Sequence, residues 1–227
     1  MADERESLFR RLSDAAKGLS GGAEEPRPGT PPAPPEPDAA ARFAELFTAA
    51  GGIVFRGVVE ESLPALAETL RSEGVTALFF PEDDGPARRV AEGLIPFGPF
   101  AVTTGAEVRG GDPAATAGFR TADAAIAETG TVVETSAGGK TLLPGLLADV
   151  HVSIVPASAV AASMEEALSV FTADPPRNIS FLSGPSKTAD IEQTLTTGAH
   201  GPKKAIALLL ARDTISLTAR LEPRVSR

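Results

Sequence analysis

Residues 179–211, ISFLSGPSKTADIEQTLTTGAHGPKKAIALLLA, decide the class of fold that the sequence predicts. The stretch begins with a short apolar strand, continues through a loop of small residues into a charged helix after Thr188, and ends with an apolar strand at 205–211. Strands that alternate with helices are typical of α/β domains. We therefore expect an α/β sheet that includes both strands.

The same alternation extends through the chain from residue 38 onwards. The predicted elements are helices that start at Asp38 and Ser62, cover 86–93 and start at Ser158, and strands at 53–59, 75–80, 150–155 and, around a Thr129–Gly130 turn, within 123–136. Residues 95–119 are mixed and Gly-rich, with only a weak strand pattern at 101–108. Together these elements predict an open sheet with helices on both faces.

The first 37 residues differ in composition from the rest of the chain. Residues 1–17 predict a short helix with Leu8, Phe9 and Leu12 as its apolar stripe, and 18–37 form a segment dense in Pro and Gly. Such a composition is typical of an extended linker. We expect the helix to dock on a partner or on the α/β domain, which we assign to residues 38–227.

Composition argues against several classes of function. The net charge is -9 and the pI is near 4.8, with no basic run, and both Tyr and Trp are absent. An acidic surface repels the phosphate backbone and the missing aromatic residues weaken base stacking, so we expect no nucleic-acid partner. The N-terminus lacks the apolar block of a signal peptide, and no apolar run approaches the ~20 residues that span a bilayer. We expect a cytoplasmic protein.

Metal and cofactor chemistry has little support in the residue types. The chain has no cysteine, which excludes thiolate nucleophiles, disulfides and cysteine-ligated iron–sulfur clusters. Its two histidines, His151 and His200, do not form an HExxH motif. We therefore predict no metal site and no cofactor, and we interpret His151 as a core or strand-end side chain with its hydrogen bonds satisfied.

The loop between the two strands of the opening stretch is a candidate ligand site. Its residues are Ser183, Gly184, Ser186, Lys187, Thr188 and Asp190. A turn that leads into a helix presents free backbone N–H groups, here beside a lysine, and could bind an anion at the carboxyl end of a strand. The alternative is a helix that caps itself. Because acidic residues follow the loop, a small carboxylate or a neutral ligand fits better than a polyphosphate.

Two further features are candidates for chemistry. The turn Glu128–Thr129–Gly130–Thr131 offers a carboxylate and two hydroxyls, as either a structural hairpin or a ligand loop. His200 lies among small residues and is a candidate general acid or base, or else a loop histidine bonded to backbone. The segment 136–141, SAGGKT, ends like a phosphate-binding P-loop, but Glu134 stands where the motif requires glycine, so we exclude it.

These segments resemble a known family. The sequences IAETGTVV, LLP, SGPSKTADIE and GAHGP, which begin at residues 126, 142, 183 and 198, resemble the LUD domain family, and within it the lactate utilization protein C branch. The resemblance extends over about 40–212. It implies the fold shared by ribose phosphate isomerases, glucosamine phosphate deaminases and CoA transferases. It also implies participation in oxidising L-lactate to pyruvate with iron–sulfur partner proteins.

Three functions remain open on these grounds. The first is a non-redox accessory or substrate-handling subunit of a lactate oxidation system, which binds a small carboxylate at the two loops. The second is a free-standing enzyme that acts on a phosphorylated or CoA-linked small molecule, with Glu128 or His200 as acid or base; this rests on fold analogy alone. The third is a scaffold that docks through its N-terminal helix.

Overall fold

The computed structural model describes residues 38–103, 115–189, 195–197 and 201–211, which belong to one compact unit, Ala33–Arg227. The helix predicted at 1–17 and the linker at 18–37 lie outside the described residues. None of the helices in the described ranges is long and apolar enough to cross a membrane.

The described part is organised around a six-stranded sheet in which each neighbouring pair is parallel. The strand order is β1-β12-β7-β4-β2-β3. The strands are β1 (Ile53–Gly57), β2 (Val75–Phe79), β3 (Ala101–Thr103), β4 (Ala115–Thr121), β7 (Val150–Pro156) and β12 (Lys204–Leu210). Parallel sheets are normally covered on both faces, and β12 is accordingly buried at six of its seven residues.

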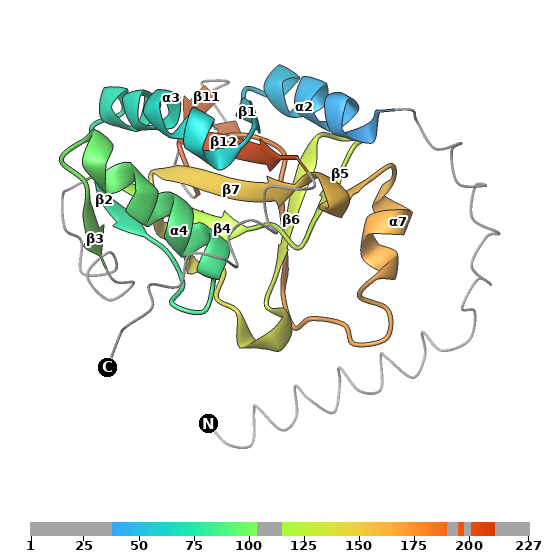
Figure 1. The fold of residues 1–227 in the computed structure, drawn as a ribbon. Helices are drawn as coiled ribbons and strands as arrows, with labels where there is room; N and C mark the ends of the chain where they lie inside the picture. The colour runs from blue at the N-terminus through green and yellow to red at the C-terminus, as the bar shows by residue number, and fades with distance from the viewer. Residues whose placement is uncertain (1–37, 104–114, 190–194, 198–200, 212–227) are drawn as a thin grey trace, which may run out of the picture. The chain divides into compact units, whose positions relative to one another are not determined.

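Alternate residues of β12 enter two different cores. Ile206, Leu208 and Leu210 pack with α3 (Val59–Ser72) and α4 (Gly85–Leu94), whereas Ala205, Ala207 and Leu209 pack with α2 (Ala39–Ala49). Figure 1 shows α3 and α4 beside the strands β7 and β4. The predicted open α/β sheet with helices on both faces is therefore confirmed.

A second, four-stranded sheet covers part of the α2 side. Its order is β8-β5-β6-β9, with strands β5 (Ala124–Ile126), β6 (Thr131–Thr135), β8 (Val160–Ala161) and β9 (Ile179–Leu182). Val132 of β6 and Leu182 of β9 pack into the same core as Phe43 and Phe47 of α2. The helix α7 (Met164–Ser169) lies beside β5 (Figure 1).

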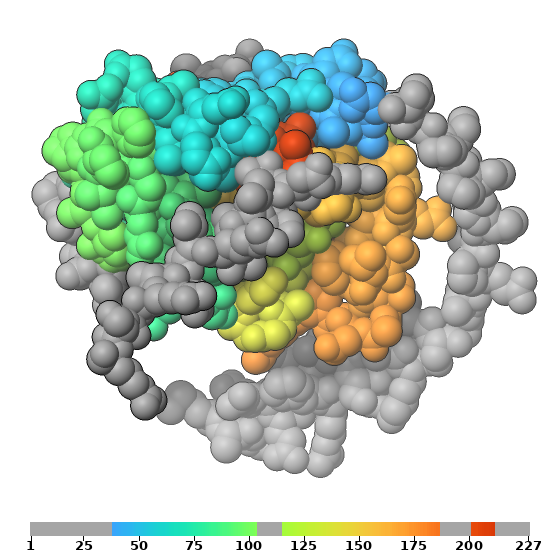
Figure 2. Space-filling view, viewed as in Figure 1, coloured from blue at the N-terminus to red at the C-terminus, as the bar shows by residue number. Residues whose placement is uncertain are grey.

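The short helix α6 (Leu143–Leu147) lies directly against β4. A Cβ at Gly118 of β4 would lie 2.2 Å from the Pro144 carbonyl oxygen, so only glycine permits this approach. The preceding turn η2 (Ala137–Gly139) is tied to the segment after α7 by the Ser136 amide, which donates to the Asn178 carbonyl at 3.0 Å. Figure 2 shows the yellow surface of the η2 region beside the orange surface of that segment.

Most predicted strands are confirmed, as are the helix that starts at Asp38 and the helix at 86–93, which is α4. Asp38 caps α2 by accepting from the Ala41 amide at 2.9 Å, and Asp84 caps α4 by accepting from the Ala87 amide at 3.1 Å. The strands expected at 53–59, 75–80 and 150–155 are β1, β2 and β7, and the two extended pieces at the Gly130 turn are the antiparallel pair β5 and β6.

Three predicted helix boundaries are wrong. Helix α3 begins at Val59 rather than after Ser62, whose hydroxyl donates to the Val58 carbonyl from within the first turn. The helix expected from Ser158 begins at Met164, because Val160 and Ala161 pair with β5 instead and Ser163 caps the helix. No helix starts at Thr188, since Lys187–Ala189 is the strand β10, paired antiparallel with β11 (Leu195–Thr197).

The strand β4, in the six-stranded sheet, is one of the elements that the sequence pattern misses. Its seven residues include Gly118 and Arg120, which interrupt the apolar run that usually marks a buried strand. Both residues are explained only by tertiary contacts. Gly118 makes room for α6, and the fully buried Arg120 is held by acidic side chains from outside the strand.

Candidate functional site

The structure brings the two predicted loops together. The Thr129 and Thr131 hydroxyls are hydrogen-bonded at 2.7 Å, and the Thr131 hydroxyl is in turn hydrogen-bonded to that of Ser183 at 2.7 Å. The cause is the antiparallel pairing of β6 with β9, which places Val132 opposite Leu182. The first residue of β6 therefore meets the residue that follows β9.

Two glycines allow both loops to lie against the end of α2. Gly130 has φ +61°, and a Cβ there would lie 2.3 Å from the Phe47 amide nitrogen. Gly184 has φ +134°, and its Cβ would lie 3.0 Å from the Ala50 carbonyl oxygen. Positive φ and close backbone approach both require glycine. Gly130 is thus a packing residue as well as a turn residue.

A cavity of about 230 Å³ lies next to the Ser183 loop. It is lined by Gly145, Leu146, Ser180, Phe181, Leu182, Ser183, Gly184, Ser186 and Pro202. Three of the predicted site residues, Ser183, Gly184 and Ser186, belong to this set. Among the residues whose side chains the structure describes, the lining offers serine hydroxyls and no cationic side chain. Such a surface fits a small polar ligand better than a highly charged phosphate.

Behind this cavity lies a buried polar cluster that the sequence pattern did not reveal. Glu134, His151 and Ser153 are 1%, 1% and 2% exposed. The His151 Nε2 atom is 2.7 Å from Glu134 Oε1, and the Ser153 hydroxyl donates to the same oxygen at 3.0 Å. His151 Nδ1 is buried with no hydrogen-bond partner among the described residues. The prediction of a fully satisfied His151 is therefore wrong at this atom.

Gly145 separates the cluster from the cavity. It lines the cavity, and a Cβ at this position would lie 3.4 Å from Glu134 Oε2 and 3.4 Å from His151 Nε2. Among the described residues, His151 and Ser153 both bond to Oε1 of the Glu134 carboxylate. Oε2 thus lies against Gly145, which covers Glu134 on the side of the cavity.

The loop does not lead into a helix at Thr188, so the expected helix N-terminus is not the source of free amides there. Residues 187–189 form a strand, and the Ser186 amide donates to the Pro202 carbonyl at 2.9 Å. The loop follows the carboxyl end of β9, as predicted, but β9 belongs to the four-stranded sheet and not to the sheet that contains β12. Pro202 precedes β12, and the Lys203 amide donates to the carbonyl of Asp149, just before β7, so the loop lies at the amino ends of these strands.

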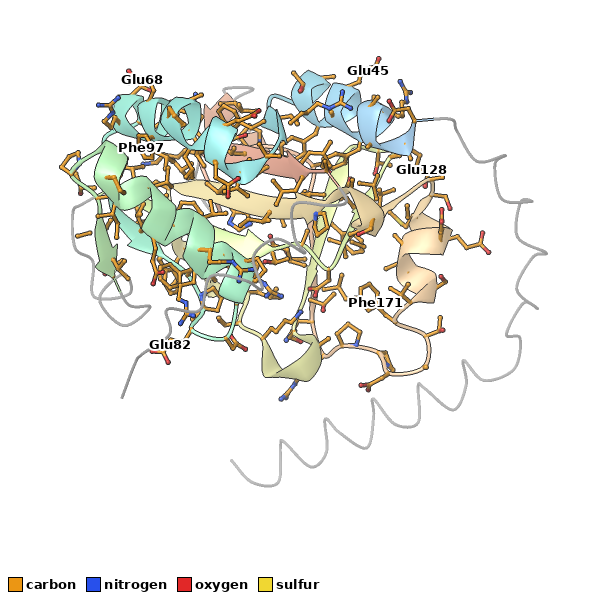
Figure 3. The ribbon with its side chains drawn as sticks, viewed as in Figure 1. Glu45, Glu68, Glu82, Phe97, Glu128 and Phe171 are labelled. Carbon is orange, nitrogen blue, oxygen red and sulfur yellow. The ribbon has the colours of Figure 1, made fainter. Side chains whose placement is uncertain are left out.

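Of the two proposed acid–base residues, Glu128 is described and does not line this cavity. The Glu128 carboxylate accepts a hydrogen bond from the Met164 amide at 2.7 Å, at the start of α7 (Figure 3). The Glu128 side chain is exposed, and from the turn at 128–131 it caps the first amide of α7. His200 and Asp190 lie outside the described residues, and for Lys187 and Thr188 the structure describes the backbone of β10. Their roles as site residues stay predictions.

An ion pair at the amino end of β7 supports the Pro202 segment. Lys203 Nζ is 2.9 Å from Asp149 Oδ1, and Asp149 Oδ2 accepts from the Thr116 amide at 3.1 Å. Burial opposes the charge of Asp149, but the bonds from Lys203 and Thr116 and the Lys203 charge outweigh it, so the pKa of Asp149 lies below its ordinary value. The same pairing raises the pKa of Lys203.

A larger cavity, of about 490 Å³, lies where β4 and β7 end. Its two carboxylates are already engaged within the protein. Asp123 binds Arg120 at 3.1 Å and Lys140 at 2.8 Å, and Glu166 accepts from the Ala162 amide at 2.8 Å. The Lys140 ammonium group is thus paired with Asp123, an arrangement consistent with the exclusion of a P-loop at 136–141. None of the predicted site residues whose side chains the structure describes lines this cavity.

The signal for the missed cluster was present in the sequence but ambiguous. Glu134 served only to exclude the P-loop, and His151 stood within an apolar strand pattern. Val132 and Glu134 are two residues apart on β6, so their side chains point to the same face of the strand. Glu134 therefore faces the core that contains Val132. A carboxylate on the buried face of a strand predicts a buried partner, but the sequence does not identify which strand supplies it.

Comparison with known proteins identifies the class of domain. Residues 102–210 match the LUD domain model, so this part of the chain is a LUD domain, and it contains the loops, the cavity and the buried cluster. The recognised family is confirmed, although the match begins later than the expected 40–212. The fold is also that of a DUF162 family protein from Deinococcus radiodurans, with a TM-score of 0.52 and 16% identity over 76% of this chain and 96% of that one.

Part of the chain is also similar to several curated proteins that share one name. The chain is 36% identical over 102 residues to lactate utilization protein C of Exiguobacterium sp., which covers 42% of this chain and 44% of the relative. It is 38% identical over 98 residues to the protein of that name from Shouchella clausii, covering 41% and 43%, and 33% identical over 103 residues to that from Bacillus subtilis, covering 43% of each. The match therefore spans less than half the length of these relatives.

Proposed function

We propose that this chain is a cytoplasmic component of a lactate utilization system. The observation that carries the proposal is its similarity to several proteins named lactate utilization protein C, at 33% to 38% identity. The LUD domain match covers the region that holds the cavity and both loops.

Within that system the chain acts as a non-redox accessory or substrate-handling subunit. The oxidation of L-lactate to pyruvate releases electrons, and iron–sulfur partner proteins would accept them. The absence of cysteine in the sequence supports this division of roles, because this chain supplies no thiolate ligands for a cluster. The serine hydroxyls of the 230 Å³ cavity would donate hydrogen bonds to a small carboxylate.

Growth on L-lactate tests the proposed function. Deleting the gene that encodes this chain should abolish growth on L-lactate as the sole carbon source and leave growth on pyruvate intact. Expression of the intact chain should restore growth. A Ser183→Ala variant, which loses the hydroxyl bonded to Thr131, should restore it poorly. A Ser72→Ala variant, which removes an exposed hydroxyl at the end of α3, is the matched control. Unchanged growth of the deletion strain on L-lactate would refute the proposal.

A further inference from the structure

The strand β9 is an edge strand that lacks the features which usually protect such an edge. In the order β8-β5-β6-β9 it pairs with β6 on one side, and no described strand lies on its other side. Its four residues, Ile179–Leu182, include no charge and no proline. Natural edge strands are commonly blocked by charged side chains, prolines, bulges or covering elements, because their free backbone groups can pair with another chain. Among the described residues, β9 is therefore open to pairing.

The register of β9 identifies its free backbone groups. Antiparallel partners alternate between pairs that exchange hydrogen bonds and pairs that do not. The Ser136 amide donates to the Asn178 carbonyl at 3.0 Å, so these two residues are a bonded pair. Thr135 and Ile179, one position further, are then an unbonded pair, and Phe181 belongs to the next unbonded pair. The N–H and C=O groups of Ile179 and Phe181 point away from β6, and no described residue bonds to them.

Exposed apolar side chains accompany these free groups. The 230 Å³ cavity lies beside β9 and is lined by Phe181 on the strand and by Leu146 on α6. Phe181 is 46% exposed, Leu146 is 56% exposed and Ile179 is 37% exposed. Exposed apolar side chains that gather at one place mark interaction surfaces. A strand laid against β9 would pair its backbone and also cover these side chains.

The charges around β9 indicate which kind of segment would bind. The chain has a net charge of -9, yet β9 and α6 contain no charged residue. Arg177, two residues before β9, is exposed and makes no hydrogen bond or ion pair with a described residue, and the exposed Asp174 does not pair with it. Complementary charge favours an acidic partner over a basic one, whereas a second copy of the chain would bring a further net charge of -9.

We propose that the free edge of β9 is a docking site for an extended acidic segment of a partner protein, which adds a fifth strand to the four-stranded sheet. In strand addition, main-chain hydrogen bonds give affinity and alternate side chains give specificity. The backbone groups of Ile179 and Phe181 form the hydrogen bonds, and Phe181 and Leu146 supply the apolar contact. Arg177 supplies the preference for acidic residues. This site goes beyond the proposed function, and its test does not involve lactate.

Labelled synthetic peptides test the proposal by fluorescence anisotropy on the full chain. The probe is an octapeptide of alternating valine and glutamate. A version with lysine in place of glutamate is the charge control, and a version with methylated peptide nitrogens lacks the backbone donors. The glutamate peptide should bind about 10-fold or more tightly than either control. No binding of the glutamate peptide at about 1 mM, or equal binding of the three peptides, would overturn the proposal.

Variants of the chain locate the bound peptide. Ile179→Pro removes one outward N–H at the first residue of an edge strand, where proline is tolerated, and should weaken binding about 10-fold or more. Phe181→Ala should weaken it, whereas Phe97→Ala, which truncates another half-exposed phenylalanine just after α4 (Figure 3), should not. Arg177→Glu should abolish the preference for glutamate over lysine, and Arg89→Glu, on the exposed face of α4, should leave it unchanged.

Melting temperatures of the variants show whether each one is folded, and Phe181→Ala and Arg177→Glu change exposed side chains only. If these two variants bind the peptide as the intact chain does, the peptide does not lie on β9 and the proposal fails. Sedimentation equilibrium without peptide tests the other occupant. A dimer that Phe181→Ala dissociates and Phe97→Ala does not would place a second copy on β9 and overturn the proposal. A monomer that binds the glutamate peptide at this edge supports it.

Discussion

Replacing Glu134 by leucine should destabilise the protein far more than its single carboxylate suggests. The Glu134 Oε1 atom accepts hydrogen bonds at 2.7 Å from His151 and 3.0 Å from Ser153, and both donors are at most 2% exposed. Leucine would leave both donors buried and unpaired. An unsatisfied buried donor costs about 1–3 kcal/mol, so the two together predict a loss of roughly 2–6 kcal/mol.

Companion variants decide whether unpaired donors are the cause. Glu134→Gln keeps an acceptor oxygen and should cost only about 1–2 kcal/mol, the difference between a charged and a neutral acceptor. Combining Glu134→Leu with His151→Phe and Ser153→Ala removes the acceptor and both donors. Replacing all partners by apolar groups can be nearly neutral, so the triple variant should recover much of the loss.

Urea unfolding followed by circular dichroism measures these free energies, with equal slopes of free energy against urea as the check that the unfolded state is unchanged. A double-mutant cycle between positions 134 and 151 gives the coupling directly. If Glu134→Leu unfolds within about 0.5 kcal/mol of the original chain, the range of ordinary surface substitutions, the cluster carries no stabilising hydrogen bonds and the reasoning fails.

Three further predictions concern the loops and the ion pairs. Gly130→Ala should lower the unfolding free energy by more than about 2 kcal/mol, because φ is +61° and the Cβ would lie 2.3 Å from the Phe47 amide nitrogen. The control Gly138→Ala, with φ +64° and no atom within 4 Å, should cost only about 1 kcal/mol, and equal shifts of the melting temperature for the two variants would contradict this. Asp149→Asn should lower stability near pH 7 but not well below pH 3.8, since a depressed pKa stabilises the fold only while the carboxylate stays ionised; a pH-independent difference between the unfolding curves would argue against the ion pair. Asp84→Ala, which removes the N-cap of α4 and the partner of the Thr121 amide and hydroxyl, should lower the unfolding free energy by about 2 kcal/mol or more, measured in urea.

Much of the fold follows from local patterns. The strands β1, β2, β7, β9 and β12 and the helices α2 and α4 appear where apolar runs and capping residues predict them. The incorrect predictions of secondary structure share one cause. A run such as Val160–Ala161 is compatible with a helix or a strand, and pairing with β5 decides between them. Lys187–Ala189 likewise has helix-start residues, yet pairs with Leu195–Thr197. Strand pairing is a long-range choice that local propensity does not record.

By itself the sequence determined the class of fold and the family of the domain, because these depend on periodicity and on contiguous motifs. The pairing of β6 with β9, which brings Thr131 to Ser183, was decided by the tertiary structure. Only the tertiary structure decided that the loop lies at the amino ends of β7 and β12, and that Glu134, His151 and Gly145 meet behind it. Those three residues come from a strand of one sheet, a strand of the other and a helix. Their chemistry depends on how the two sheets pack, which no single segment of the sequence specifies.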